Sequence, residues 1–274
     1  MKKIVAVFTS VAFILALSGM LTLSYAADKM LEGAVTKVTG KVSVRHSKVK
    51  TWEPVEVNMP VKAGDTIVTT PESEVEIIMD DGTVLRLEQR TAIVIEESSI
   101  NKTTGKKSVD INLKSGKLLN NIEKLIKRES KYRVKTPTAV IGVRGTEFAT
   151  EVSTSNKTTV AVYGGTVAVK ASESEDEDDD AEIAVGTEQE TSIEAGQKKP
   201  AEPTGLSEES KNYYADKVAE FEKRVQANRE RLEEIIAAKQ AYIENKVKEK
   251  SQKIEDRKKK FEDMQKKMEQ GTEE

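Results

Sequence analysis

Cysteine is missing from all 274 residues of the chain. Its absence excludes a disulfide framework, a thiolate catalytic site and a lipid anchor of the kind that is attached to a cysteine after export. Histidine occurs only once, as His46. Because zinc sites draw on several ligands at short spacings, this lone histidine predicts neither a metal site nor a catalytic role.

Catalytic and cofactor-binding motifs are missing as well. The sequence has no Gly-x-Ser-x-Gly elbow, no Walker loop and no dinucleotide-binding glycine motif. Carboxylate pairs are numerous, but 47 acidic and 44 basic residues produce such pairs by chance. We therefore predict a protein that is not an enzyme and holds no cofactor. A net charge of −3 is too small to indicate a nucleic-acid partner.

Apolar residues are also scarce, at 37% of the chain against 33% charged residues, so much of the chain is expected to be solvated. The longest apolar run is the one that follows Met1-Lys2-Lys3 and extends from Ile4 to Leu23. Ser24-Tyr25-Ala26 then places small residues at positions −3 and −1 of a cleavage site, which predicts a signal peptide over residues 1–26. The alternative is an uncleaved helix anchored in the inner membrane. Either reading predicts a periplasmic or extracellular location for the remainder.

Residues 31–197 show the period-two alternation of β-strands, with turn residues about every ten positions. Asp81-Gly82 and Gly164-Gly165 each separate two apolar runs and predict hairpins. Trp52, the one tryptophan, is expected to pack in the core. Residues 118–126 have helical spacing and predict a short helix or a covering loop. The fold class predicted is an all-β repetitive domain, either stacked like a β-roll or solenoid or arranged like a sandwich.

Several segments in this region, taken in order, resemble the FecR domain family. They are Gly64 to Thr69, Asp81 to Leu87, Val134 to Phe148, Val160 to Val169 and Ala195-Gly196-Gln197. The resemblance covers residues 32–200. The signature positions, which we expect to be structural, are Gly64, Asp65, Asp81, Gly82, Pro137, Gly142, Arg144, Gly145, Thr146, Gly165 and Gly196.

The resemblance implies an extracytoplasmic β module that binds partners and does no chemistry. Founding members of the family are single-pass regulators of iron uptake that signal to a cytoplasmic sigma factor. Their sigma-facing domain precedes the membrane helix, whereas only Met1-Lys2-Lys3 precedes the apolar run in this chain. We therefore expect a stand-alone exported FecR domain protein that lacks the sigma-regulator domain.

Two charged features within the β region have open interpretations. Arg144 lies between Gly142 and Gly145, where its guanidinium could clamp the carbonyls of adjacent turns or bind a partner carboxylate. Residues 173–180 form an acidic run, which predicts a solvated loop, with weak divalent-cation binding as the alternative.

The C-terminal part predicts a charged helical or coiled-coil segment over residues 207–270, after a linker at 198–205. Ser207 is the expected N-cap, and neither Pro nor Gly follows before Gln270. Apolar residues keep a 3–4 spacing from Tyr214 to Ile235 and again from Ile243 to Met268, slipped by one residue. A repeat of eleven residues would place the apolar residues of both stretches on one face of the helix. The stripe predicts homo-oligomerisation or folding back onto the β domain, and a lone charged helix is the remaining alternative.

These features together predict a non-catalytic envelope binding or assembly module. The β domain would recognise an envelope protein partner or a ligand, and the helix would mediate oligomerisation or spacing. The alternative is the extracytoplasmic sensor of a signalling system that acts through a separate membrane partner.

Overall fold

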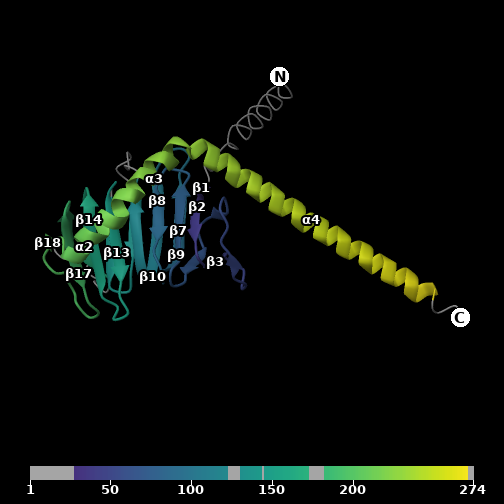
Figure 1. Ribbon diagram of the computed structural model, residues 1–274, viewed down its shortest axis with the longest axis horizontal. Coiled ribbons are helices and arrows are strands. Elements are labelled where there is room, and N and C mark those ends of the chain that lie inside the picture. Colours follow the sequence, from purple (N-terminus) through teal and green to yellow (C-terminus); the bar gives the residue numbers. More distant parts are fainter. Residues whose placement is uncertain (1–27, 123–129, 144, 173–181, 271–274) are drawn as a thin grey trace, which may run out of the picture.

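The computed structural model describes residues 28–122, 130–143, 145–172 and 182–270, with backbone only for 266–270. The fold is mostly β-sheet, with 43% strand, and ends in a C-terminal helix (Figure 1). The signal peptide predicted at 1–26, Arg144 and the acidic loop at 173–180 lie outside the described residues.

The strands form two sheets that share β10 (Lys107–Asn121). Sheet A contains, in spatial order, β4 (Glu53–Pro54), β3 (Val42–Arg45), β6 (Thr66–Thr69), β9 (Ala92–Ile100), the first part of β10, β11 (Lys131–Lys135), β12 (Ala139–Val143), β15 (Thr166–Ala171) and β16 (Ile183–Gly186), with β1 (Lys29–Met30) on the end of β9.

Sheet B contains the remaining strands. In spatial order they are β5 (Pro60–Val61), β2 (Gly33–Thr39), β7 (Glu74–Met79), β8 (Val84–Leu87), the last part of β10, β13 (Glu147–Val152), β14 (Thr158–Gly164), β17 (Gln189–Ile193) and β18 (Thr204–Gly205).

One core joins the two sheets, because alternate residues of their strands point to the same interior. From sheet B, Val75, Ile77 and Met79 of β7 contribute to it, and from sheet A, Ile93 and Ile95 of β9. Each of these side chains is at most 2% exposed. The period-two pattern of the sequence therefore corresponds to the inward-facing side chains.

The chain crosses repeatedly from one sheet to the other, and nine of the crossings contain a residue with positive φ. These residues are Gly40, Asn58, Gly64, Glu72, Arg90, Gly116, Gly145, Gly165 and Glu188. Left-handed backbone turns the chain sharply enough to leave one sheet and enter the other, and glycine adopts it at the lowest steric cost. The corners therefore account for much of the glycine in this domain.

Gly116 marks the crossing within β10. Residues up to Ser115 pair with β9 in sheet A, and residues from Gly116 pair with β13 in sheet B. Gly116 has a φ of 84°. A Cβ at this position would lie 2.4 Å from Thr91 Oγ1 and 2.6 Å from the carbonyl oxygen of Arg90. The position thus requires glycine both for its backbone angle and for space.

Two local predictions differ from the structure, and a third is confirmed. The Gly164-Gly165 hairpin is wrong, because β14 pairs with β13 and β17 whereas β15 pairs with β12 and β16. No helix begins at Leu118, because residues 118–121 continue β10, while 123–126 lie outside the described residues. Asp81-Gly82 does form the β7–β8 hairpin, but only Gly82 has positive φ, so the turn is not type I′.

The solenoid alternative is not supported, since a solenoid stacks successive coils whereas these strands pair antiparallel, apart from β10 with β11. The coiled-coil prediction is not supported either, because the C-terminal segment is a single succession of helices in the described chain. Its parts are α2 (Glu208–Tyr213), the π-helix η2 (Tyr214–Val218), α3 (Ala219–Glu230) and α4 (Leu232–Gln270).

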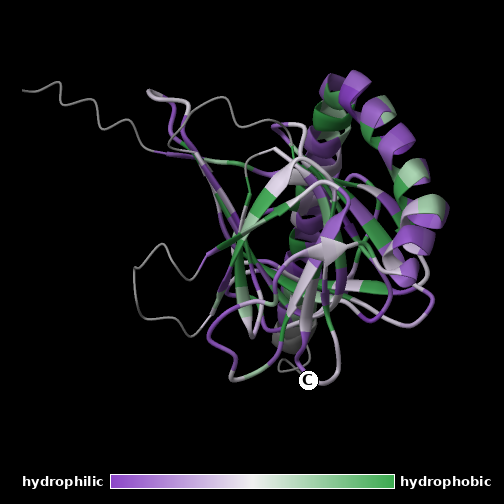
Figure 2. Ribbon diagram, turned by 90° about the vertical axis from the view of Figure 1, so that its left-hand side faces the viewer, coloured by the Kyte–Doolittle hydropathy of each residue, from purple (hydrophilic) through white to green (hydrophobic). Residues whose placement is uncertain are grey.

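The helical segment begins with Ser207 as its N-cap, whose hydroxyl accepts a hydrogen bond from the backbone N–H of Ser210. It breaks at Arg231, where φ is −105° and ψ is 16°. Before the break it lies along one side of the sheets, and after it α4 extends away from them (Figures 1 and 2). With 39 residues, α4 is about 58 Å long.

We expect Gly116→Ala to lower the free energy of unfolding by about 2 kcal/mol more than Gly196→Ala, because an added Cβ clashes only at Gly116. Gly196 is the matched control, since its φ is 81° but nothing lies within 4 Å of an added Cβ. The control is expected to cost about 1 kcal/mol for left-handed backbone alone. Urea unfolding measures both, and equal losses would show that crowding at Gly116 is relieved without cost.

Candidate functional site

The outer face of sheet B is covered by the first half of the helical segment, which crosses it diagonally (Figure 1). Val218, Phe221 and Val225 are at most 2% exposed and pack on this face. The sheet contributes apolar residues from five strands: Ile78, Val84, Leu119, Ala149, Ala161 and Tyr163. Sheet B is therefore buried on both faces, and its outer face is an interface between the β domain and the helix.

Charged residues lie within the same interface, grouped around Arg86, which is 1% exposed. Arg86 Nε lies 2.9 Å from Glu88 Oε1, and its guanidinium also pairs with Glu74. Glu76, also 1% exposed, lies opposite Arg86 on β7. Lys37 completes the group by pairing with Glu74 at 2.7 Å. Ion pairs this deeply buried are expensive to desolvate, and they are tolerated only when each charge has partners.

The helix supplies the missing charge for this group. Arg224 of α3 donates to both carboxylate oxygens of Glu76, at 2.7–3.1 Å, across 148 residues of sequence. The hydroxyl of Tyr213 donates to Glu88 Oε1 at 3.0 Å. Three carboxylates thus meet three basic side chains, one of which, Arg224, comes from the helix and also pairs there with Glu220. We call these residues the clamp: Lys37, Glu74, Glu76, Arg86, Glu88, Tyr213 and Arg224.

Burial and charge shift the pKa values within the clamp. Burial alone would raise the pKa of Glu74, but the hydrogen bond from Lys37 and the charge of Arg86 outweigh it, so this pKa lies below the usual range. Burial raises the pKa of Tyr213 far above its ordinary value, and the neighbouring Glu88 carboxylate raises it further. Glu74 is therefore a carboxylate and Tyr213 a hydrogen-bond donor at neutral pH.

A second polar group lies further along α3, around Glu147 of β13. Burial raises the pKa of Glu147 to about 8, helped by a hydrogen bond with the carboxyl group of Glu222. Asn121 donates to Glu147 Oε1 at 3.0 Å, and Arg229 donates to Asn121 Oδ1 at 2.8 Å. Glu147 therefore holds its proton at neutral pH, and its hydrogen bond with Glu222 crosses the interface.

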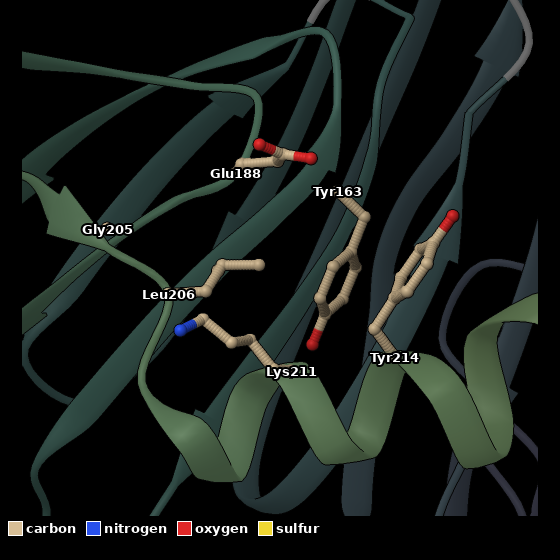
Figure 3. Close-up of a pocket in the computed structure, with 6 residues that line it drawn as sticks. All are labelled: Tyr163, Glu188, Gly205, Leu206, Lys211 and Tyr214. Carbon is tan, nitrogen blue, oxygen red and sulfur yellow. The ribbon is translucent and has the colours of Figure 1, made fainter.

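A pocket of about 430 Å³ opens where α2 and η2 meet the edge of sheet B (Figure 3). The rings of Tyr163 and Tyr214 lie with their centroids 5.1 Å apart, tilted by 34°, and their hydroxyl groups point in opposite directions. Lys211 and Leu206 lie beside them, with Glu188 above. The pocket therefore offers aromatic faces, one ammonium group and one carboxylate.

The base of α4 contacts the opposite end of the β domain. Lys239 is 3% exposed and donates to Asp80 Oδ1 at 2.7 Å. Tyr242 donates to Glu56 Oε2 at 2.9 Å, and Lys246 pairs with the same oxygen at 3.1 Å. These contacts orient the start of α4 relative to the sheets.

His46 lies near this end, with its Nδ1 2.9 Å from Asp65 Oδ1 and its Nε2 2.8 Å from Glu53 Oε1. Sequence spacing gave no indication of this arrangement, because His46 follows β3, Glu53 belongs to β4 and Asp65 precedes β6. Trp52, by contrast, is not in the core: it is 46% exposed, and the guanidinium of Arg45 lies 5.0 Å from its ring centroid. Trp52 directly precedes β4, the edge strand of sheet A, so no element covers it.

The family-signature residues do not converge on one site. Gly64, Gly145 and Gly165 are corner residues. Asp65 is fully buried, and its Oδ2 accepts a hydrogen bond from the backbone of Lys62 at 3.0 Å. The others occupy turns or strands: Asp81 and Gly82 between β7 and β8, Pro137 between β11 and β12, Gly142 in β12, Thr146 before β13 and Gly196 after β17. Arg144 lies outside the described residues, so its binding role stays a prediction.

The residues that sequence reasoning missed are those on the outer face of sheet B. Glu76 and Arg86 occupy outward positions of strands, and the sequence pattern assigned them no role. The available signal was that other outward positions of the same strands are apolar, as at Ile78 and Val84. A covered outer face requires such residues.

Among the described residues, no three His, Asp or Glu side chains are grouped so that they could hold a metal ion. None of the helices described there combines the length and apolar character needed to cross a membrane.

Residues 65–168 match the family model described as FecR protein. Two crystal structures of a candidate anti-sigma factor from Parabacteroides distasonis are similar to the chain at 14% and 16% identity, both with a TM-score of 0.42. These alignments cover 56% of this chain and 64% and 65% of those chains, less than two thirds of either. At that TM-score they carry no argument about the fold. No curated protein matches the chain.

We expect Arg224→Ala to lower the free energy of unfolding by about 2–3 kcal/mol, because it leaves the Glu76 carboxylate buried without its main partner from the helix. Arg224 is itself 24% exposed, so solvent screening reduces the loss from the full buried-pair value. Arg231→Ala is the matched control, since its ion pair with Glu234 is about 70% exposed and is expected to contribute less than about 0.5 kcal/mol. Equal values for the two variants in urea unfolding would contradict a clamp.

Stability is expected to fall between about pH 4.5 and pH 8 through the Glu147 proton. The folded chain holds this proton up to about pH 8, whereas an unfolded glutamate releases it near pH 4.5. Its contribution is therefore complete below pH 4.5 and is lost as the pH rises through 8, with a slope of at most about 1.4 kcal/mol per pH unit.

Urea unfolding as a function of pH measures this slope, which Glu147→Gln and Glu222→Gln should each reduce. Glu151→Gln is the control on the same strand, because Glu151 is 41% exposed and pairs with Lys117. An unchanged slope in Glu147→Gln would assign the proton to another group.

Proposed function

Because residues 65–168 form a FecR domain, we propose that the chain is the non-catalytic sensor of a regulatory system in the cell envelope. The β domain recognises the signal, and the helical segment carries the response to a separate partner. The protein is exported by its N-terminal segment and acts outside the cytoplasm.

One observation carries this proposal: the pocket in Figure 3 is lined by both parts of the molecule. Tyr163 and Glu188 belong to the β domain, whereas Lys211 and Tyr214 belong to α2 and η2. A ligand in the pocket therefore touches the sheet and the helix at the same time. Its binding energy acts directly on the interface between them.

The chemistry of the pocket favours a small polar ligand with one flat, weakly polar face. Such a face stacks on the tyrosine rings, as the two rings now stack on one another. Lys211 and Glu188 then provide one positive and one negative group at the rim. A purely apolar ligand would leave the Glu188 carboxylate desolvated without compensation, whereas Lys211 keeps its ion pair with Glu208.

The clamp explains how a signal in the pocket reaches the rest of the helix. Tyr213 follows Lys211 by two residues and precedes Tyr214, and it donates to Glu88 of the clamp. A ligand that separates Tyr214 from Tyr163 would move Tyr213 and weaken this contact. Because the buried Glu76 carboxylate has its close partner, Arg224, only while the helix is docked, a small displacement of the helix has a large electrostatic effect.

An assembly role is the second candidate, and a different observation favours it. The distal part of α4 exposes large apolar residues, among them Val247, Ile254 and Phe261 at 57–68%. A helix that only spaced two domains would have no need of them. In an assembly module the β domain would be a fixed base and would respond to no signal.

The two candidates are separated by deleting the gene in its native host and measuring transcription. A sensor predicts that a defined set of genes changes expression and that the wild-type chain restores it. We expect Tyr214→Ala to fail in restoration and Tyr214→Phe to succeed, because the ring rather than the hydroxyl makes the contact with Tyr163. Tyr214 is 36% exposed, so its loss should lower stability by only about 1 kcal/mol.

Trp52→Ala is the control in this experiment, as it removes another exposed aromatic ring away from the pocket. Unchanged transcription after deletion would reject the sensor role in favour of assembly. Altered transcription that Tyr214→Ala restores fully would keep the sensor role but reject the pocket as its signal site.

A further inference from the structure

The distal part of α4 carries an apolar seam that nothing in the described chain covers. The last contact of α4 with the β domain is the ion pair of Lys246 with Glu56. From there the helix projects away from the sheets (Figure 1). Five large apolar residues lie along it at 37–68% exposure: Ile243, Val247, Ile254, Phe261 and Met264.

These residues follow a seven-residue repeat. Val247, Ile254 and Phe261 are spaced by seven and occupy the a positions, and Ile243 and Met264 occupy d positions. At its base the seam adjoins the β domain, because Ile243 and Val247 line a pocket with Glu56 and Met59 and Lys246 pairs with Glu56. Beyond Lys250 it lies clear of the described β domain. An apolar stripe confined to a and d is the narrow seam of a two-helix contact, not the broad face that packs on a sheet or enters a lipid surface.

Charge along the helix is sorted by face. Residues 246–260 contain eight Lys or Arg and three Asp or Glu, a net charge of +5. Most positions that border the seam are basic: Lys246, Lys253 and Lys260 at g, Lys258 at e, and Lys250 and Arg257 at the two remaining d positions. The other e positions hold Glu244, Ser251 and Gln265. All the acidic residues from 246 to 265 fall at b or c, on the far side: Glu249, Glu255, Asp256, Glu262 and Asp263.

Most cations beside the seam have no ion-pair partner among the described residues. In the part of the chain that the structure describes, Lys250, Lys253, Arg257 and Lys260 form no ion pair. Only Lys246, at the base, and Lys258, which reaches Glu262 at 4.0 Å, have one. Helices of this type select partners through the charges at e and g.

A second copy of the chain fits this seam poorly in either orientation. In a parallel pair, Lys253 at g would face Lys258 at e of the other copy, and Lys250 and Arg257 at d would each face their own equivalents. In an antiparallel pair, g faces g, which brings lysines together again. Like charges beside a seam oppose association.

We propose that residues 243–264 bind an amphipathic helix of another protein whose residues flanking its own seam are Asp and Glu. Acidic e and g positions would pair with Lys253, Lys258 and Lys260, and acidic residues at the seam would meet Lys250 and Arg257. The three apolar a positions would provide the contact between them. The proposal rests on the proposed function only in taking α4 as the part that meets the partner.

The test uses the full chain and three synthetic helical peptides of about four heptads, each with Ile at a and Leu at d. One peptide has Glu at all e and g positions, one has Gln and one has Lys. We expect the Glu peptide to bind at least about tenfold more tightly than the Gln peptide, and the Lys peptide not to bind. Isothermal titration calorimetry at physiological ionic strength measures all three.

Two variants of equal charge separate a specific seam from general attraction. Lys253→Glu with Lys260→Glu changes the g positions, whereas Lys248→Glu with Lys259→Glu makes the same change in net charge at b and f, away from the seam. The first pair should weaken binding of the Glu peptide at least about tenfold and the second less than about threefold. All four residues are exposed, so both variants should fold.

Several results would overturn the proposal. Equal losses in the two variants would indicate non-specific attraction, and tighter binding to vesicles with one-third phosphatidylglycerol than to the Glu peptide would indicate a membrane surface. A dimer in sedimentation equilibrium that Phe261→Lys dissociates would indicate a second copy. Failure of the Glu peptide would also reject it while leaving the transcription test of the pocket, which involves Tyr214, unaffected.

Discussion

Left-handed backbone at the corners is the constraint on which this architecture depends. The chain passes from one sheet to the other after most strands, and each such passage needs a sharper turn than extended residues allow. Nine crossings meet the need with positive φ, most of them through glycine. Because the corners hold both sheets over one core, the outer face of sheet B is a continuous platform. The helical segment can then lie across five of its strands, from β14 to β7.

The interface formed on that platform is unusual in combining an apolar row with a buried charged group. The apolar row, centred on Phe221, supplies the affinity between helix and sheet. The clamp fixes the position of α3 along the sheet, because Arg224 can donate hydrogen bonds to Glu76 in one position only. The proton that Glu147 holds at neutral pH makes the same interface sensitive to pH. A helix that is held by both apolar packing and ion pairs is well suited to respond to a ligand that binds in the pocket beside it.

Much of the β domain could be predicted from the sequence, because its core strands alternate cleanly, as in Val75, Ile77 and Met79. The Asp81-Gly82 hairpin and the Ser207 cap were predictable for the same reason: their signals are local. Gly164-Gly165 was misread because a corner and a hairpin use the same residues, and only the pairing of distant strands distinguishes them. Glu76 and Arg86 were missed because nothing local to them shows that a helix 148 residues away covers them. The apolar stripe of the C-terminal segment shifts by one residue between Ile235 and Ile243. This shift separates the stretch that packs on the sheet, around Phe221, from the stretch that is exposed, around Ile254.

The attachment of α4 has a mechanical consequence. Its contacts with the β domain are confined to the first four turns, at Lys239, Tyr242 and Lys246, while the helix continues without support. Such a helix is a lever with a short inner arm and a long outer arm. Met264 lies about 37 Å along the axis from Lys239, so a tilt of about 5° at the base displaces it by about 3 Å. A rearrangement no larger than the loss of one hydrogen bond at the sheet would therefore reach the far end of the molecule as a movement of nearly a side chain's width.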